Sequence, residues 1–215
     1  MKLLNQFGKS VSSNITFTAV LLIGGMVPLA AVATEHFEGV ATLCAIDQAV
    51  IDGAEQKGNK GVLVQNDMGF IYYFQADDPD SLMNGWEDQT NNWKKTRKDV
   101  EFYWGHTTFI PEGYEATGTL EEDFKFKSEV ILTGYSGTLK GTGALESVTV
   151  DFDLSPPNAM PVSEFPPECW GFQAVCGDCT CYPAISPGPD NTPGTADDVF
   201  TQYDISGLIH GYESE

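Results

Sequence analysis

One stretch of this chain alternates strictly between polar and apolar residues. From Ser147 to Leu154 the even-numbered positions carry Val, Val, Phe and Leu, and the odd-numbered positions carry Ser, Thr, Asp and Asp. Successive side chains of a β-strand point to opposite faces, so the pattern predicts a strand with one dry face and one wet face. Phe124 and Phe126 alternate with two lysines in the same way, and we expect both to face inward. These segments favour an all-β fold.

Other strand-like runs are short and are separated by turns that contain Gly, Asn and Asp. Between residues 35 and 154 no long segment has the apolar period of a helix, which is about 3.6 residues. About eight strands predict a closed antiparallel β-barrel, with a two-sheet sandwich or jelly roll as the alternative. The additional runs are Glu38–Ile46, Gly61–Val64, Phe70–Gln75, Ala116–Leu120 and Glu129–Leu132.

Glycines favour the barrel over the sandwich. Gly134, Gly137, Gly141 and Gly143 punctuate one stretch, and glycine within strands marks bulges and bends where a sheet curves. With the aromatic run Tyr103-Trp-Gly-His-Thr-Thr-Phe109 ahead of it, this stretch resembles the secreted β-barrels related to allene oxide cyclase and the dirigent proteins. The resemblance implies the fold and an interior pocket for an apolar ligand. It assigns no catalytic residue.

The first 33 residues have the features of a signal peptide. Two lysines precede the apolar run Ala19–Ala30, and Ala31-Val-Ala33 is a small-residue cleavage pattern. We therefore expect an exported protein, periplasmic or extracellular, with no transmembrane span once the leader is removed. The chain has 11 Lys and Arg against 31 Asp and Glu, a formal charge of −20, which argues against a nucleic-acid partner because phosphate binding needs basic residues.

Residues 34–154 are expected to form the barrel, and residues 155–215 a Pro-, Cys- and Asp-rich C-terminal extension. Prolines crowd its first part and predict an irregular strap lying across the barrel. In an exported chain the cysteines predict disulfides of undetermined pairing, with a zinc site made by the last four as the weaker alternative. A bridge from the first cysteine would pin the strap to the barrel. The five are Cys44, Cys169, Cys176, Cys179 and Cys181.

The segment Pro187–Asp198 offers several oxygen ligands between glycine turns. Asp190, Asn191, Asp197 and Asp198 supply side-chain oxygens, the ligand type that Ca²⁺ prefers. The segment also resembles the Gly-Thr-x-Asp-Asp loops of bacterial exported proteins that are regarded as calcium-binding. It lacks the spacing of an EF-hand. The alternative is a solvated acidic turn whose side chains cap the local backbone.

Catalytic signals are few. His106 has the same strand parity as Phe102 and Trp104, so it is expected to point inward and is the one candidate for a catalytic group. A histidine that is simply hydrogen-bonded in the core is the alternative. Glu121, Glu122 and Asp123 are expected to be solvated surface charges.

Binding signals lie mainly in the tryptophans. Trp86, Trp93 and Trp104 could form a stacking surface for a glycan, although tryptophans in a β-rich domain also pack in the core. The basic segment 94–98 could meet an anionic cell-surface polymer. Three functions follow: a non-catalytic binding or structural protein, which we favour; a barrel isomerase or cyclase acting on an apolar ligand; and a carbohydrate-binding module.

Overall fold

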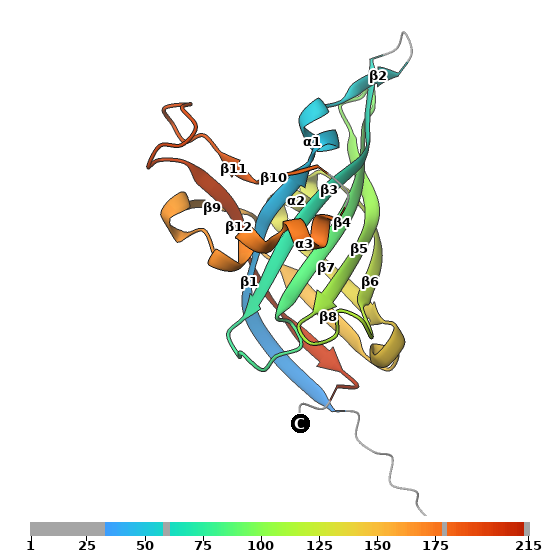
Figure 1. The fold of residues 1–215 in the computed structure, drawn as a ribbon. Helices are drawn as coiled ribbons and strands as arrows, with labels where there is room; N and C mark the ends of the chain where they lie inside the picture. The colour runs from blue at the N-terminus through green and yellow to red at the C-terminus, as the bar shows by residue number, and fades with distance from the viewer. Residues whose placement is uncertain (1–32, 58–60, 178–179, 213–215) are drawn as a thin grey trace, which may run out of the picture. The chain divides into compact units, whose positions relative to one another are not determined.

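The computed structural model describes residues 33–57, 61–177 and 180–212, and these form a closed antiparallel β-barrel of eight strands. The strands follow one another around the barrel in the order β1, β12, β8, β7, β6, β5, β4 and β3, and β3 pairs with β1 to close it. Figure 1 shows the barrel with β1 and β3 lying beside each other. The prediction of an all-β barrel is confirmed.

The elements have the following bounds: β1 Thr34–Asp47, α1 Gln48–Asp52, β2 Glu55–Lys57, β3 Val62–Ala76, β4 Gly85–Lys95, β5 Glu101–Pro111, β6 Leu120–Lys127, α2 Glu129–Thr133, β7 Tyr135–Gly141, η1 Gly143–Leu145, β8 Thr149–Leu154, β9 Asn158–Pro161, η2 Val162–Glu164, η3 Pro167–Gly171, α3 Gln173–Cys176, β10 Cys181–Pro183, β11 Ile185–Ser186 and β12 Val199–His210.

Two strand predictions were wrong, and within residues 34–154 one barrel strand was missed. The run 129–132 lies in the short helix α2. Residues 116–119 form turn and loop before β6 begins. The missed strand is β4, whose inward residues Glu87, Gln89 and Asn91 are polar and therefore give no apolar alternation.

The C-terminal extension is also not wholly outside the barrel. The strand β12, at residues 199–210, pairs with β1 and β8 and is part of the barrel wall. What lies across the outside is the segment 155–198, hereafter the strap. In Figure 1 the orange part of the strap, including α3, crosses the outer side of β3 and β4.

One half of the barrel is packed solid. Its fully buried side chains include Phe109, Leu120 and Ile209, and the Phe109 ring packs edge-on against Phe74 with 5.1 Å between centroids. The loop between β3 and β4 contributes Leu82 and Met83 to the same cluster. This half lies at the end where the first residues of β1 pair with the last residues of β12.

The strap covers a second apolar cluster on the outer side of the barrel wall. Ile71 and Tyr73 project outward from β3, because the alternate residues Phe70, Tyr72 and Phe74 line the interior. The strap packs Phe165 and Phe172 onto this face. The outer surface of the barrel wall at β1 and β3 is therefore buried beneath the strap.

Candidate functional site

The other half of the barrel contains a cavity of about 300 Å³. Its inner limit is the packed half, and its outer end is lined by Val130 of α2, Gly134 and Ser155, which lie in or beside the connections that follow β6 and β8. Such a volume is at the lower end of the range for small-molecule sites, about 300–1,000 Å³. Nine aromatic residues line the cavity: Phe70, Tyr72, Phe74, Tyr103, Phe124, Phe126, Tyr135, Phe152 and Tyr203.

These rings form continuous walls. Tyr103 and Phe124 each stack on Phe126, with 5.6 Å between centroids in both pairs. Phe126 also contacts Tyr135 at 5.3 Å, and Tyr135 meets Phe152 at 5.9 Å. The inward direction predicted for Phe124 and Phe126 agrees with this lining. Four consecutive strands, β5 to β8, thus present a continuous aromatic surface to any molecule in the cavity.

A polar ladder runs along the inner face of β4. The amide of Asn91 donates to Gln89 Oε1 at 3.0 Å, and the amide of Gln89 donates to the Thr107 hydroxyl at 3.2 Å. That hydroxyl donates to Glu87 Oε1 at 3.3 Å. Glu87, Gln89 and Asn91 alternate along one strand, so all three face the interior, and Thr107 lies opposite Gln89 on β5.

The Asn91 end of this ladder has an acceptor without a partner. Asn91 is buried, and its Oδ1 has no hydrogen-bond partner among the residues that the structure describes. An unsatisfied buried polar atom costs about 1–3 kcal/mol.

Two carboxyl groups also face the cavity. Burial raises the pKa of Glu87 from 4.5 to about 8, against the opposing effect of the Thr107 hydrogen bond. Glu122 accepts a hydrogen bond from the Tyr135 hydroxyl at 2.6 Å, and burial raises its pKa as well. Gly137 makes room for this carboxylate, because a Cβ there would lie 2.6 Å from Glu122 Oε2.

The expectation that Glu122 is a solvated surface charge was therefore wrong. The sequence held the signal that would have corrected it: Glu122 has the same strand parity as Phe124 and Phe126, which were expected to face inward. No comparable signal marked Glu87, since the inward side of β4 is polar throughout the cavity.

Comparison with known proteins identifies no relative. No family model, no curated protein and no solved structure matches the chain. The eight-stranded antiparallel barrel is consistent with the fold that the resemblance to allene oxide cyclase and dirigent barrels implies, but no relative supports that particular family. The functional argument therefore depends on the geometry of the cavity.

His106 does not lie in the cavity. Its side chain is 47% exposed on the outer surface, where Nδ1 is 3.0 Å from Asp123 Oδ1 and Nε2 is 3.2 Å from the Thr108 hydroxyl. The inward prediction failed because both faces of β5 carry aromatic residues. Tyr103, with Thr107, faces inward, whereas Trp104 and His106 face outward.

The three tryptophans do not form one stacking surface. Trp86 lies beneath the strap and packs against Tyr73, with 5.1 Å between ring centroids. Trp93 is on the opposite face of β4, and its indole N–H donates to Glu101 at 3.3 Å. Trp104 lines an open depression on the outer surface. Phe102, Lys94 and Lys125 line the same depression.

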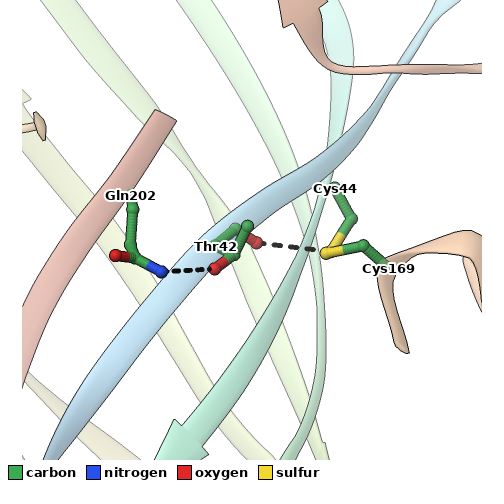
Figure 2. The surroundings of a disulfide bond; sticks show 4 residues. All are labelled: Thr42, Cys44, Cys169 and Gln202. Carbon is green, nitrogen blue, oxygen red and sulfur yellow. Dashed lines mark hydrogen bonds between the residues drawn. A yellow bond between two sulfur atoms is a disulfide. The ribbon is translucent and has the colours of Figure 1, made fainter. Parts of the chain in front are cut away.

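The cysteines form two disulfides, Cys44–Cys169 and Cys176–Cys181, and Cys179 lies outside the described residues. The first bridge joins β1 to η3 and pins the strap to the barrel, a pairing that the sequence had left open. Figure 2 shows its surroundings: the Gln202 amide donates to the Thr42 hydroxyl at 3.1 Å, beside the Cys44 sulfur. Three of the four sulfurs considered as zinc ligands are therefore used in disulfides.

The acidic loop forms a compact turn between β11 and β12. The Thr195 hydroxyl contacts carboxylate oxygens of Asp190, Asp197 and Asp198, and the backbone N–H of Gly194 donates to Asp198 at 2.7 Å. Asn191 is exposed and has a φ of 54°. Within the described ranges, no group of three or more His, Cys, Asp or Glu residues is arranged to hold a metal ion. Calcium binding remains a prediction.

The predicted leader, residues 1–33, falls outside the described residues except for its last residue. In the part of the chain that the structure describes, no helix has the length and apolar character needed to cross a membrane.

Proposed function

We propose that this protein is an exported, non-catalytic binding protein that holds a small, largely apolar ligand in the hollow half of its barrel. The observation that supports this most is the cavity itself, in which nine aromatic side chains surround a short row of polar groups. Sites of this composition bind ligands by apolar contact and orient them with a few hydrogen bonds. The Glu122 carboxyl group is one such group.

Export is part of the proposal. Two disulfides are typical of proteins that mature in an oxidising compartment. The leader pattern at residues 1–33 points to the same route. The catalytic alternative loses the group on which it was based, because His106 lies on the outer surface.

The binding proposal is tested by calorimetric titration with indole, a small neutral aromatic compound. Val130 faces the cavity from α2, whereas its neighbour Glu129 is exposed. Val130→Trp should fill the outer end and weaken indole binding at least tenfold, and Glu129→Trp should leave it unchanged. If indole binds both variants as it binds the parent, or if neither indole nor its charged counterpart phenethylamine binds, the proposed function is overturned.

A second candidate is glycan binding at the outer depression. It combines the Trp104 ring with Phe102, Lys94 and Lys125, which suits an anionic polysaccharide because sugars stack on aromatic rings and lysines attract the charge. Trp104→Ala should then abolish retention on an immobilised anionic polysaccharide. Trp170→Ala is the matched control, since Trp170 is 57% exposed on the strap. Equal retention of both variants would exclude this function.

A further inference from the structure

We infer that the ligand of the cavity is an organic cation, an arylalkyl amine whose ammonium group is bound by Glu122 and Glu87. This inference rests on the proposed function and deepens it by assigning the ligand class. Three independent features of the lining support it: the direction of its hydrogen bonds, the sign of its charges and the nature of its walls.

The first feature is that hydrogen bonds of the lining run toward its carboxyl groups. The amides of Asn91 and Gln89 and the hydroxyl of Thr107 each donate along the ladder toward Glu87. The Tyr135 hydroxyl donates to Glu122. The carboxyl groups of Glu87 and Glu122 keep further acceptor capacity for a ligand that carries N–H donors.

The second feature is charge. The lining contains two carboxyl groups, and none of the described residues that line the cavity is Lys, Arg or His. A positive group would be attracted to the Glu122 carboxylate in surroundings where water screens little, and it would favour the ionised form of Glu87, whose pKa burial raises to about 8. The net charge of −20 acts in the same direction at long range, because it raises the local concentration of cations around the protein.

The third feature is the aromatic wall. The faces of Phe and Tyr rings attract cations, and cavities enclosed by several such rings are suited to ammonium ligands. Tyr103, Phe124, Phe126 and Tyr135 form one continuous set of ring contacts, and Tyr135 joins it directly to Glu122. An ammonium group near Glu122 would therefore meet both a carboxylate and ring faces, while the aryl part of the ligand stacks further along the wall.

The same lining excludes other ligand classes. A carboxylate or phosphate would face the Glu122 carboxylate with no basic residue in the described lining to balance it, which costs several kcal/mol for like charges in contact. A neutral aromatic molecule would be accepted by the walls but would leave the acceptors unsatisfied. The cavity thus disfavours anions, because its described lining has no basic residue, and favours cations, because that lining has carboxyl groups.

Three ligands of similar shape test the inference: phenethylamine, 2-phenylethanol and 3-phenylpropionate, each titrated into the full chain by calorimetry at pH 7. The amine should bind at least tenfold more tightly than the alcohol, and the carboxylate should bind most weakly. Tenfold corresponds to about 1.4 kcal/mol.

Glu122→Gln should remove the preference of the amine over the alcohol. The matched control is Glu121→Gln, because Glu121 does not line the cavity and accepts a hydrogen bond from the Thr119 hydroxyl instead. Melting curves of both variants establish that they are folded. Should Glu122→Gln unfold the protein, Glu87→Gln titrated at pH 9, where the Glu87 carboxyl is ionised, provides the second test, with the same expected loss of preference.

The outcomes separate the two proposals. If the alcohol or the carboxylate binds as tightly as the amine, or if Glu122→Gln and Glu121→Gln keep the same amine preference, the ligand class is wrong while the binding function stands. If none of the three ligands binds and indole also fails, both proposals are overturned.

Discussion

The two halves of the barrel use the same kind of strand for different purposes. In one half inward side chains such as Phe109, Leu120 and Ile209 fill the interior, as close packing of protein cores requires. In the other half nine aromatic side chains line the interior but leave about 300 Å³ between them, and a row of polar groups replaces aliphatic ones. Stability and binding capacity are thus separated along the barrel axis.

The hollow half is supported from outside. On β3 the residues Ile71 and Tyr73 lie under the strap, while the adjacent Tyr72 faces the cavity. Burying the outer face supplies apolar contact that the hollow interior does not, at roughly 25 cal/mol per Å². The Cys44–Cys169 bridge fixes the strap to this wall. We therefore expect the strap to support the wall of the cavity from the outside.

Removing the Cys44–Cys169 bridge should give the largest change in stability. The bridge spans 125 residues, and the chain-entropy relation gives about 5 kcal/mol for a loop of that length. The double variant Cys44→Ala/Cys169→Ala should lose most of this in urea denaturation. It should also bind indole more weakly, because the wall of the cavity loses its outer support.

The matched control is Cys176→Ala/Cys181→Ala. That bridge spans 5 residues, for which the same relation gives about 2 kcal/mol. Equal losses from the two double variants, or unchanged indole affinity without the long bridge, would contradict the bracing role of the strap.

Replacing a phenylalanine by alanine should lower the free energy of unfolding more in the packed half than in the hollow half. Phe109→Ala removes a fully buried ring and should destabilise the protein by about 3–5 kcal/mol. Phe126→Ala removes a half-buried ring that already borders empty space, and about 1–2 kcal/mol is expected. Chemical denaturation of both variants measures the difference. Similar costs would mean that the two halves are packed alike.

The buried Glu87 predicts a pH dependence that belongs to the hollow half. Its pKa is about 8 in the folded protein and 4.5 is the ordinary value, so between these values the folded state holds a proton that the unfolded state has lost. Stability should therefore fall as pH rises from 4.5 to 8, by about 1.4 kcal/mol per pH unit. The groups that act on Glu87 are Glu122, Asp88, Tyr72, Tyr135 and Tyr203.

Glu87→Gln should flatten this decline when unfolding free energies at pH 5 and pH 8 are compared. Glu38→Gln is the control, because Glu38 is exposed on β1 and should leave the slope unchanged. A slope that persists in Glu87→Gln would show that the other buried acids, Glu122 and Asp88, are responsible.

The smallest effect is expected at the acidic loop. If Asp190, Asp197 and Asp198 bind Ca²⁺, as the sequence predicts, chelation should lower the melting temperature by a few degrees, since an ion bound only to the native state stabilises it. Asp197→Asn should abolish the response to chelator, whereas Asp153→Asn on β8 should preserve it. Superimposable melting curves with and without chelator would leave the loop as an internally hydrogen-bonded turn.

Sequence reasoning succeeded where one face of a strand was apolar and the other charged. The alternation 147–154 and the pair Phe124 and Phe126 both gave the correct inward side. It failed on β5, where Trp104 and Tyr103 are both aromatic and face opposite ways. The glycine argument led to the right fold, but Gly137 lies in a regular part of the β7–β8 pairing and makes room for Glu122.

The sequence by itself predicted an antiparallel barrel, with a sandwich as the alternative, and predicted disulfides without their pairing. Only the tertiary structure decided that β12 closes the wall, that Glu87 and Glu122 face a cavity and that His106 does not. The physical reason is that alternation assigns residues to two faces without saying which face is inside. In this barrel the strap covers apolar residues on part of the outer face, and polar residues line part of the cavity on the inner face. Apolar character therefore does not distinguish the inner face from the outer face.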